Sequence, residues 1–324
     1  MAQHPAIELV IDRIVQDLIG GAADTAREVM TAVSQVVKDS QAHSLAGMYN
    51  DLDEAVLAIM KICPSFAPPI NALHMVMGTL EKDMEAGASM ETAKKHLAET
   101  EARFTELLDT AFEKIANIGA EMIKEGDTVC MFSMSSSVWK VLRRAKKQGK
   151  NFNLLVTEAR PANEGLWTVK EMHKSGIPVE VSIDACLAEL VARSNLVFAG
   201  VDSIAADGSV FNKSGTYLAA LVAKQYGVPF YFVTDTLKFD TATLLGLPFR
   251  SEPVQYHEVL GEEKYASGVK VVGALFDTTP PHLVTAIITE LGPIPPSACV
   301  NVMWNMKLSK RVSELIPAWA YGKL

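Results

Sequence analysis

The sequence predicts an α/β protein in which an N-terminal all-helical domain precedes a doubly wound, Rossmann-like parallel sheet domain. Up to about residue 124, apolar residues recur at helical spacing. Beyond residue 126, short apolar runs alternate with amphipathic stretches, which is typical of repeated βαβ units. We therefore expect a helical domain over residues 1–124 and a Rossmann-like domain over residues 125–324, the latter with a strand-end ligand site and a dimer interface.

The helical spacing is clearest near the two ends of the first domain. The apolar positions are Leu9, Ile11, Ile14, Val15 and Leu18, and then Phe104, Leu107, Leu108, Ala111, Phe112 and Ile115. Between them lies the segment CPSFAPPIN, from Cys63 to Asn71, whose three prolines a continuous helix does not tolerate. We expect this segment to connect two helices.

Six apolar runs in the second domain are predicted to be strands. They are TVCMFS, NFNLLVTE, PVEVSI, LVFAGV, PFYFVT and VKVVGAL. Polar or small residues that favour helix N-termini lie between them, near Ser135, Asn163, Asp184, Ser214 and Thr241. Because such sheets bind ligands outside the carboxyl ends of their strands, the segments that follow the strands are the ones to search.

Composition and charge exclude several kinds of partner. A content of 49% hydrophobic and 21% charged residues indicates a folded globular chain. The formal net charge of -8 opposes binding along a phosphate backbone. The cluster of Lys140, Arg143, Arg144 and Lys147 on one predicted helix is interpreted as a solvated face, so we expect no direct contact with nucleic acid.

Other classes are excluded by what the sequence lacks. The four cysteines show no paired spacing typical of a zinc site or a disulfide framework, and they fit a reducing compartment. The N-terminus lacks the features of a signal peptide, and no apolar stretch of about 20 residues occurs. Dinucleotide, P-loop, zincin and hydrolase motifs are absent. We expect a cytoplasmic protein without membrane contact, cofactor or bound metal.

Polar residues gather in six successive segments after the predicted strands. These segments are FSMSSS, TEARPANEG, SIDAC, GVDSIAADG, NKSGT and TLKFD. Polarity is ordinary for one loop, but six loops in succession, most of them with carboxylates, favour a binding site.

Four blocks, VTEARP, GVDSIAADGSVFNKSGT, KFD and FDTTPPHLVTAIITELGPIPPSA, resemble a known family in the same order. This is the family of the translation initiation factor 2B α, β and δ subunits, which also contains methylthioribose-1-phosphate isomerase and ribose-1,5-bisphosphate isomerase. The resemblance runs from about Asp12 to the end of the chain. It implies either an enzyme of aldose–ketose isomerase lineage or a non-catalytic, ligand-sensing regulatory subunit.

The resemblance also implies catalytic positions. Asp202, in GVDSI, matches the catalytic aspartate of the isomerases, although a structural role in capping the following turn has equal weight. Ser133 stands at the position of the catalytic cysteine, and a hydroxyl needs a partner to take its proton. Cys186, near a predicted helix N-terminus, is a candidate replacement thiol, though the role of a small buried hydrophobe is more usual. Cys130 should point to the opposite face of its strand from Ser133.

Three of the substrate contacts that the resemblance implies differ in charge from the family pattern. The isomerases carry an arginine in a block that reads here Gly20, Gly21 and Ala22. A second arginine is missing because none occurs between Arg27 and Arg103. Glu164 stands where the family has glutamine. Two cations are lost and one anion is gained, which disfavours a phosphate dianion.

The remaining implied substrate contacts match the family pattern. They are Glu158, Arg160, Asn212, Lys213 and Lys238. An ion pair with Glu158, which would make Arg160 a structural strut, is an equally weighted alternative. We expect a small sugar-like or nucleotide-like ligand, a substrate altered from the usual sugar 1-phosphates, and a homodimer.

Overall fold

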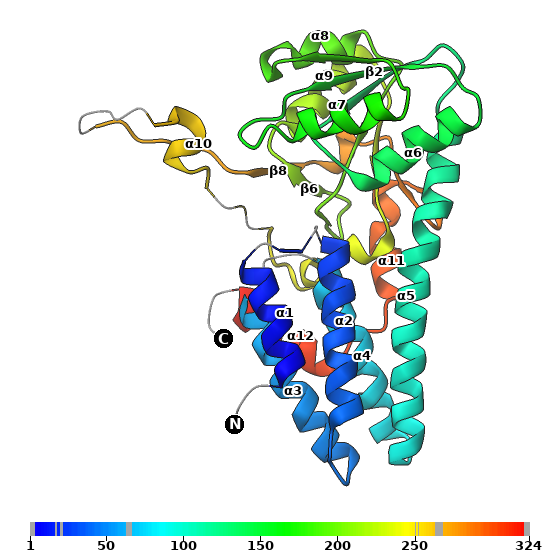
Figure 1. The fold of residues 1–324 in the computed structure, drawn as a ribbon, viewed down its shortest axis with the longest axis vertical. Helices are drawn as coiled ribbons and strands as arrows, with labels where there is room; N and C mark the ends of the chain where they lie inside the picture. The colour runs from blue at the N-terminus through cyan, green and yellow to red at the C-terminus, as the bar shows by residue number, and fades with distance from the viewer. Residues whose placement is uncertain are drawn as a thin grey trace. The chain divides into compact units, whose positions relative to one another are not determined.

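The computed structural model describes residues 4–16, 18–19, 22–62, 67–249, 251, 253–262 and 268–320. The chain divides into two compact units. The helical unit comprises Met1–Asp109, Leu237–Pro248 and Asn301–Leu324, and the sheet unit comprises Thr110–Thr236 and Phe249–Val300. A helical N-terminal region followed by a mostly parallel sheet confirms the predicted fold class (Figure 1).

This division differs from the expected boundary between residues 124 and 125. It falls inside one continuous helix, α5 (Met90–Glu121), because the last turns of that helix bury Ala111 and Ile115 in the core of the sheet unit. The C-terminal helix α12 (Lys310–Ala320) belongs to the helical unit, because Val312 and Ile316 pack into the core of that unit.

Four further helices build the helical unit: α1 (Pro5–Val15), α2 (Ala22–Asp39), α3 (Leu45–Ile62) and α4 (Ala67–Glu85). Helix α1 begins where the side chain of His4 accepts a hydrogen bond from the Ala6 amide and proline occupies the first turn. The predicted connecting segment falls between α3 and α4. Residues 63–66 of it lie outside the described residues, and the two remaining prolines occupy the first turn of α4, where proline is tolerated.

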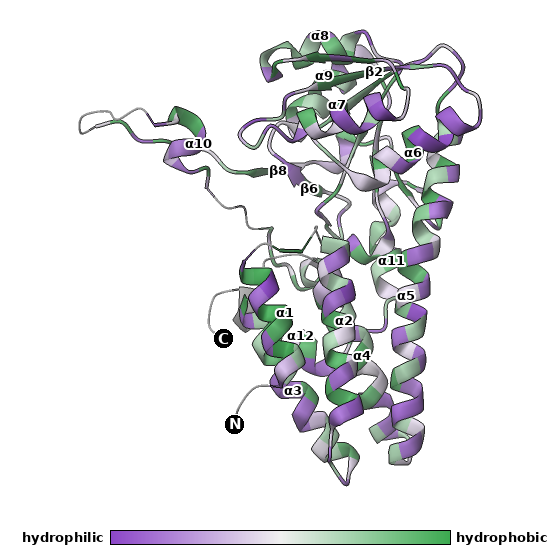
Figure 2. Ribbon diagram, viewed as in Figure 1, coloured by the Kyte–Doolittle hydropathy of each residue, from purple (hydrophilic) through white to green (hydrophobic). Residues whose placement is uncertain are grey.

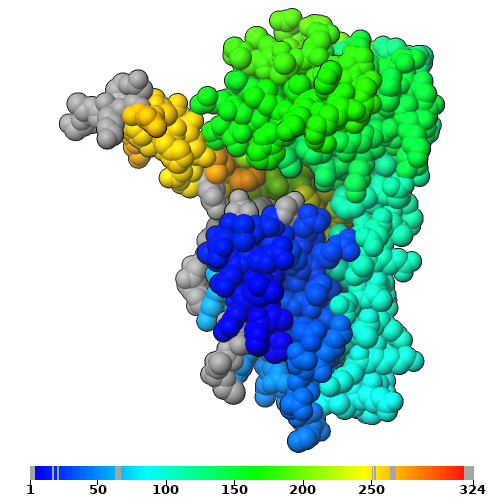
Figure 3. Space-filling model, viewed as in Figure 1, coloured from blue at the N-terminus to red at the C-terminus, as the bar shows by residue number. Residues whose placement is uncertain are grey.

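The core of the helical unit is formed mainly by α2 and α4. Buried residues on α4, such as Leu73, Met77 and Leu80, follow helical spacing, and Val29 and Val33 of α2 belong to the same cluster. Apolar and polar residues alternate along α2, as Figure 2 shows, whereas the first half of α4, from Ala67 to His74, is buried on all sides. Figure 3 shows α1 and α2, in blue, on one face of this unit.

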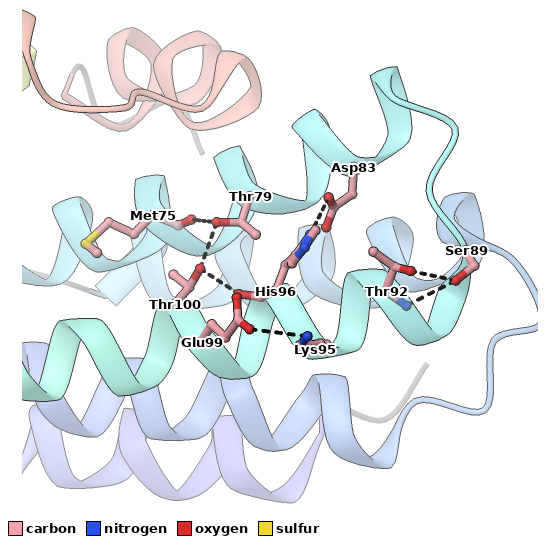
Figure 4. Close-up of polar contacts among 9 residues, drawn as sticks. All are labelled: Met75, Thr79, Asp83, Ser89, Thr92, Lys95, His96, Glu99 and Thr100. Atoms are coloured by element: carbon pink, nitrogen blue, oxygen red, sulfur yellow. Dashed lines mark hydrogen bonds and ion pairs between the residues drawn. The ribbon is translucent and has the colours of Figure 1, made fainter.

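Polar contacts join α4 to α5 (Figure 4). The His96 ring Nδ1 lies 2.8 Å from Asp83 Oδ1, and the hydroxyls of Thr79 and Thr100 are 3.0 Å apart. Each threonine hydroxyl also lies within hydrogen-bonding distance of the carbonyl four residues earlier in its own helix. Because a hydroxyl has one proton, one threonine donates to its carbonyl while the other donates across the contact. These bonds satisfy polar groups where the two helices meet, so the contact is specific as well as apolar.

The N-terminus of α12 is held by acceptors on α3 and α4. Glu81 accepts hydrogen bonds from the Ser309 hydroxyl and from the amides of Lys310 and Arg311, at 2.8 to 3.0 Å. The Arg311 guanidinium in turn makes two bonds, of 2.6 and 2.9 Å, to Asp53. A carboxylate at a helix N-terminus satisfies free amides and favours the helix dipole, so these contacts fasten the C-terminal helix.

The buried imidazole of His74 predicts a pH dependence of stability. Its Nδ1 accepts a hydrogen bond from the Ser309 amide at 3.1 Å, the residue is 2% exposed, and burial lowers its pKa to about 4. This stabilisation is complete above about pH 6.5 and is lost as pH falls through about 4. Relative to His74→Asn, which keeps an acceptor, the free energy of unfolding should fall by roughly 3 kcal/mol over that interval.

The measurement is urea denaturation at a series of pH values. The matched control is His43→Asn, because His43 is exposed on the same unit. The free energies of unfolding of this variant and of the parent should differ by the same amount at every pH. Equal slopes for the parent and His74→Asn would contradict the assignment.

The larger sheet of the sheet unit has seven strands in the order β10-β9-β7-β4-β1-β2-β3. Six strands are parallel, and only β10 pairs antiparallel, with β9. The strands are β1 (Thr128–Phe132), β2 (Asn153–Thr157), β3 (Val179–Ser182), β4 (Leu196–Ala199), β7 (Phe230–Val233), β9 (Ala286–Thr289) and β10 (Gly292–Ile294). The chain moves outward from β1 in both directions, as a doubly wound sheet requires.

Five of the six predicted strands are confirmed as β1, β2, β3, β4 and β7. The sixth, VKVVGAL, is wrong, because among the described residues its only pairing is an isolated bridge between Pro253 and Ala274. Its valines indicate a strand, but no strand in the described part of the chain covers them, and Val272 is 77% exposed. Parallel strand β9 and a three-stranded antiparallel sheet of β5 (Ser203–Ile204), β6 (Val210–Lys213) and β8 (Phe276–Thr279) were not predicted.

Four helices of the sheet unit begin close to predicted residues: α6 (Ser136–Lys147), α7 (Glu164–Lys174), α8 (Leu187–Ala192) and α9 (Thr216–Tyr226). Two further helices, α10 (Tyr256–Leu260) and α11 (Cys299–Trp304), were not predicted, and α11 ends in the helical unit. The start predicted near Thr241 is a short 3₁₀ helix, which belongs to the helical unit. Short 3₁₀ helices are η1 (Asp184–Cys186), η2 (Thr236–Lys238), η3 (Thr241–Leu245), η4 (Pro281–Leu283) and η5 (Pro296–Ala298). The segment around α10 projects from the body of this unit (Figures 1 and 3).

Side chains of the predicted basic cluster on α6 are largely paired. Arg143 donates to Glu171 at 2.8 Å, Arg144 pairs with Glu113, and Lys140 lies 3.6 Å from the centre of the Phe112 ring. This pairing leaves little free positive charge for a polyanion. No helix in the described ranges is long and apolar enough to cross a membrane.

Candidate active site at the strand ends

Ser133 lies directly after β1 and points its hydroxyl at a carboxylate. Its Oγ donates a hydrogen bond of 2.6 Å to Glu164 Oε2. Ser133 is 2% exposed and has a left-handed backbone, with φ of 63°. A short bond from a hydroxyl to a carboxylate is the strong, charge-assisted kind, so the position of the Ser133 oxygen is well defined.

Glu164 is presented by a tightly folded loop that joins β2 to α7. The Gly165 amide donates to the Glu158 carbonyl at 3.0 Å. Asp184, which follows the neighbouring strand β3, accepts hydrogen bonds from the amides of Ala159 and Arg160, at 2.9 and 2.8 Å. These contacts fold the loop back on itself, and Glu164 becomes the first residue of α7.

Lys213, the last residue of β6, completes the cluster. Its Nζ lies 3.1 Å from Glu164 Oε1, and the two side chains are only 11% and 20% exposed. The same ammonium lies 4.8 Å from the centre of the Phe276 ring. Lys213 was predicted to contact a ligand, but its positive charge is balanced by Glu164.

Asp202 follows β4, the parallel neighbour of β1, so it and Ser133 leave adjacent strand ends. The segments after these strands are in close contact, because a Cβ added to Gly200 would lie 2.7 Å from Ser135 Cβ. The Asp202 amide donates to the Phe211 carbonyl at 3.0 Å, and strand β5 follows at once. Asp202 is half-buried at this edge.

The two cysteines of this region are less well placed for chemistry than Ser133. Cys186 is half-buried in η1 after β3, the edge strand, which lies two strands from β1, or roughly 10 Å in the sheet. Cys130 is buried within β1, and burial raises the pKa of its thiol to about 12. The geometry thus favours Ser133, with its carboxylate partner, over either thiol.

Three other predicted contacts make local bonds. The exposed Arg160 donates to the Glu258 carbonyl of α10 at 3.0 Å, a different partner from Glu158, which was the alternative to a ligand contact. Glu158 contributes its main chain to the loop. The side-chain amide of Asn212 donates to the Thr216 hydroxyl at 2.9 Å, and that hydroxyl donates to the Lys213 carbonyl. These two bonds stiffen the end of β6.

The remaining predicted residues belong to the helical unit. Ala22 is the buried first residue of α2, and Lys238 ends η2. Gly20 and Gly21 lie outside the described residues. All four stay predictions as ligand contacts.

Two residues in the region of the cluster were missed by sequence reasoning. The buried Thr168 hydroxyl donates to the Ser133 carbonyl at 3.0 Å. Asp277 on β8 accepts from the amides of Gly215 and Tyr217 at the start of α9, and burial raises its pKa to about 6, a shift that those bonds partly offset. Asp277 lies in the FDTTPP block, whose resemblance to the family could have pointed to it, whereas no sequence motif includes Thr168.

In the described segments, no group of three or more histidine, cysteine, aspartate or glutamate side chains is arranged to hold a metal ion. The strand-end cluster of Ser133, Glu164 and Lys213 offers oxygen and nitrogen groups of the kind that transfer protons.

The fold and the cluster define a doubly wound α/β protein with a helical N-terminal region and a strand-end site of acid/base groups. Residues 18–296 match the model of the Initiation factor 2 subunit family, and the chain belongs to that family. This confirms the resemblance found in the sequence blocks.

Curated relatives cover nearly the whole chain. Ribose 1,5-bisphosphate isomerase of Pyrococcus furiosus is 31% identical over 297 residues, 91% of this chain and 92% of that protein. The protein of the same name from Archaeoglobus fulgidus is 33% identical, over 88% of each chain. The crystal structure of the Pyrococcus horikoshii translation initiation factor eIF-2B matches with a TM-score of 0.72 and 26% identity, covering 92% of this chain and 99% of that one.

Proposed function

We propose that the chain is an enzyme of aldose–ketose isomerase lineage that acts on a sugar-derived compound with less negative charge than a sugar bisphosphate. Two relatives of similar length are named ribose 1,5-bisphosphate isomerases. Interconversion of an aldose and a ketose moves a proton between adjacent carbons, which needs an acid and a base. Asp202 and the Ser133–Glu164 pair leave adjacent strands and supply groups of that kind.

The observation that carries the altered substrate is the ion pair of Glu164 and Lys213. A lysine with a carboxylate 3.1 Å away is a poor anchor for phosphate, because its charge is already balanced. Two unit charges about 4 Å apart interact by about 4 kcal/mol at an effective dielectric of 20, so a phosphate dianion near Glu164 meets a substantial penalty. A neutral or singly charged polyol would instead hydrogen bond to these groups.

The test is a thermal-shift panel in which the sugar stays constant while its charge changes. Ribose, ribose 5-phosphate and ribose 1,5-bisphosphate form such a series, and amino sugars extend it to cations. We expect the neutral, cationic or singly phosphorylated members to stabilise the protein more than the bisphosphate. Preferential stabilisation by the bisphosphate would overturn the altered substrate while leaving the lineage intact.

Activity is tested by proton exchange. A ligand that stabilises the protein should exchange a carbon-bound proton with solvent deuterium, as seen by NMR, and Asp202→Asn should slow that exchange about 100-fold or more. Exchange that is unchanged by this substitution would remove Asp202 from the mechanism.

A second candidate function is a non-catalytic, ligand-sensing subunit. It is favoured by the likeness to a protein named translation initiation factor eIF-2B and by a hydroxyl where the isomerases carry a thiol. Stabilising ligands that show no proton exchange under any condition would favour this candidate over the enzyme.

A homodimer is also proposed. The apolar segment VNVMWNM, residues 300–306, overlaps α11, and Trp304 at the end of that helix is 72% exposed. Size-exclusion chromatography with light scattering should give twice the chain mass of 35.1 kDa. A mass of one chain at micromolar concentration would refute the dimer.

A further inference from the structure

We infer that Ser133 and Glu164 work as one acid/base unit, in which Ser133 passes a proton between the bound ligand and Glu164. The inference rests on the proposed function for the reaction that it serves. The arrangement itself rests on contacts within the sheet unit.

The two oxygens of Glu164 are in different environments. Oε1 faces the Lys213 ammonium at 3.1 Å, whereas Oε2 accepts the Ser133 hydroxyl at 2.6 Å. Lysine has only donors to offer, so Oε1 is held as an acceptor. Oε2 is therefore the oxygen that can take the serine proton.

Helix α7 holds Ser133 at two points. Glu164 and Thr168 are one turn apart on the same face, where the first binds the Ser133 hydroxyl and the second donates to its carbonyl. The Trp139 indole donates to the Thr168 hydroxyl at 2.9 Å, which fixes that hydroxyl as the donor to Ser133.

The conformation of Ser133 needs such support. A serine with φ of 63° is in a left-handed conformation that costs of order 1 kcal/mol or more. This conformation aims the Ser133 side chain at Glu164 rather than along the strand. Strained backbone of this kind is common at active sites, and here the buried Thr168 hydroxyl holds it in place.

The proton transfer balances without any further reactant. On the open-chain sugar, a C–H bond next to the carbonyl breaks, and its electron pair forms the C=C bond of an enediolate. The proton bonds to Ser133 Oγ while the original hydroxyl proton moves to Glu164 Oε2, and the carbonyl π electron pair moves to its oxygen, so the negative charge passes from Glu164 to that oxygen. The hydroxyl proton of the neighbouring carbon then shifts to that oxygen, which leaves the negative charge on the neighbouring oxygen. Ser133 gives its proton to the former carbonyl carbon and regains one from Glu164, which gives the isomer and restores both residues.

The relay is tested first without any substrate. In Ser133→Cys, the thiol at residue 133 is alkylated by iodoacetamide only as thiolate, so the pH dependence of alkylation reports its pKa. A carboxylate at hydrogen-bonding distance raises that pKa, and the double variant Ser133→Cys, Glu164→Gln should therefore react with a midpoint about one pH unit or more lower.

The control is Ser136→Cys, which places a thiol on the exposed first residue of α6. Its midpoint should move much less when Glu164 is changed to glutamine. Equal midpoints with and without Glu164, or a thiol at residue 133 that never reacts, would overturn the relay. Because no substrate is involved, this result is independent of whether the isomerase proposal stands.

Thr168 is a positioning residue in this scheme. Thr168→Val keeps the shape and removes the donor, so we expect proton exchange into a stabilising ligand to fall about tenfold while the thermal shift from that ligand is unchanged. Thr168→Ser, which keeps the hydroxyl, should restore exchange. A parallel loss of exchange and thermal shift in the valine variant would overturn the positioning role.

Discussion

Gly165→Ala is expected to remove a large part of the stability of the sheet unit. A Cβ on this residue would lie 1.8 Å from the Thr157 carbonyl oxygen and within 3.0 Å of two further backbone carbons. Thr157 is the last residue of β2, which is paired on both sides, so the backbone cannot withdraw. The free energy of unfolding should fall by about 3 kcal/mol or more, against a total of about 5–15 kcal/mol for a typical domain.

Urea denaturation followed by circular dichroism measures this loss. The matched control is Gly78→Ala, since Gly78 also lies in a helix but the nearest atoms to its added Cβ are 3.5 Å away. Alanine is the better helix former, so this control should be neutral or gain up to about 1 kcal/mol. Similar losses for both variants would show that the close approach at Gly165 is not the cause.

Glu164→Gln is expected to create affinity for a sugar bisphosphate. The substitution removes one negative charge and leaves the Lys213 ammonium, now without its ion pair, for a phosphate group. Even a partly screened interaction of this kind corresponds to about a 100-fold or greater gain in affinity. Isothermal titration calorimetry with ribose 1,5-bisphosphate, at one ionic strength, measures it.

The control for this change is Glu158→Gln, which makes the same chemical substitution in the same loop. Glu158 contributes its amide and carbonyl to the fold, so we expect little change in bisphosphate affinity. An equal gain in the two variants would show a general charge effect rather than release of Lys213. The glutamine at residue 164 should also abolish proton exchange, which separates tighter binding from turnover.

The fold was largely predictable because strands β1, β2, β4 and β7 are short apolar runs that are buried on both faces. The errors fall where tertiary context decides. The valines of VKVVGAL favour a strand but pair with no strand among the described residues, whereas β9 is a run of only four residues that becomes a strand because β7 lies beside it. The last turns of α5 pack on the sheet, and their spacing gives no sign of which core they enter.

The residues of the candidate site could be named from the sequence, but their contacts with one another could not. The sequence blocks indicated Ser133, Glu164 and Lys213 separately, one from each of three strand-end segments. Their mutual pairing depends on side-chain directions that follow from the left-handed turn at Ser133 and the folded loop before α7. Thr168 looked like any polar residue on a helix, because its role appears only when α7 lies beside the end of β1.

The 2.6 Å contact between Ser133 and Glu164 makes the two positions depend on each other in the proposed relay. A serine facing glutamine would have no group to receive its proton, and a cysteine facing glutamate would hold its thiol in the protonated form. Under that proposal neither residue tolerates exchange alone, so the effects of changing both are not the sum of the effects of changing each.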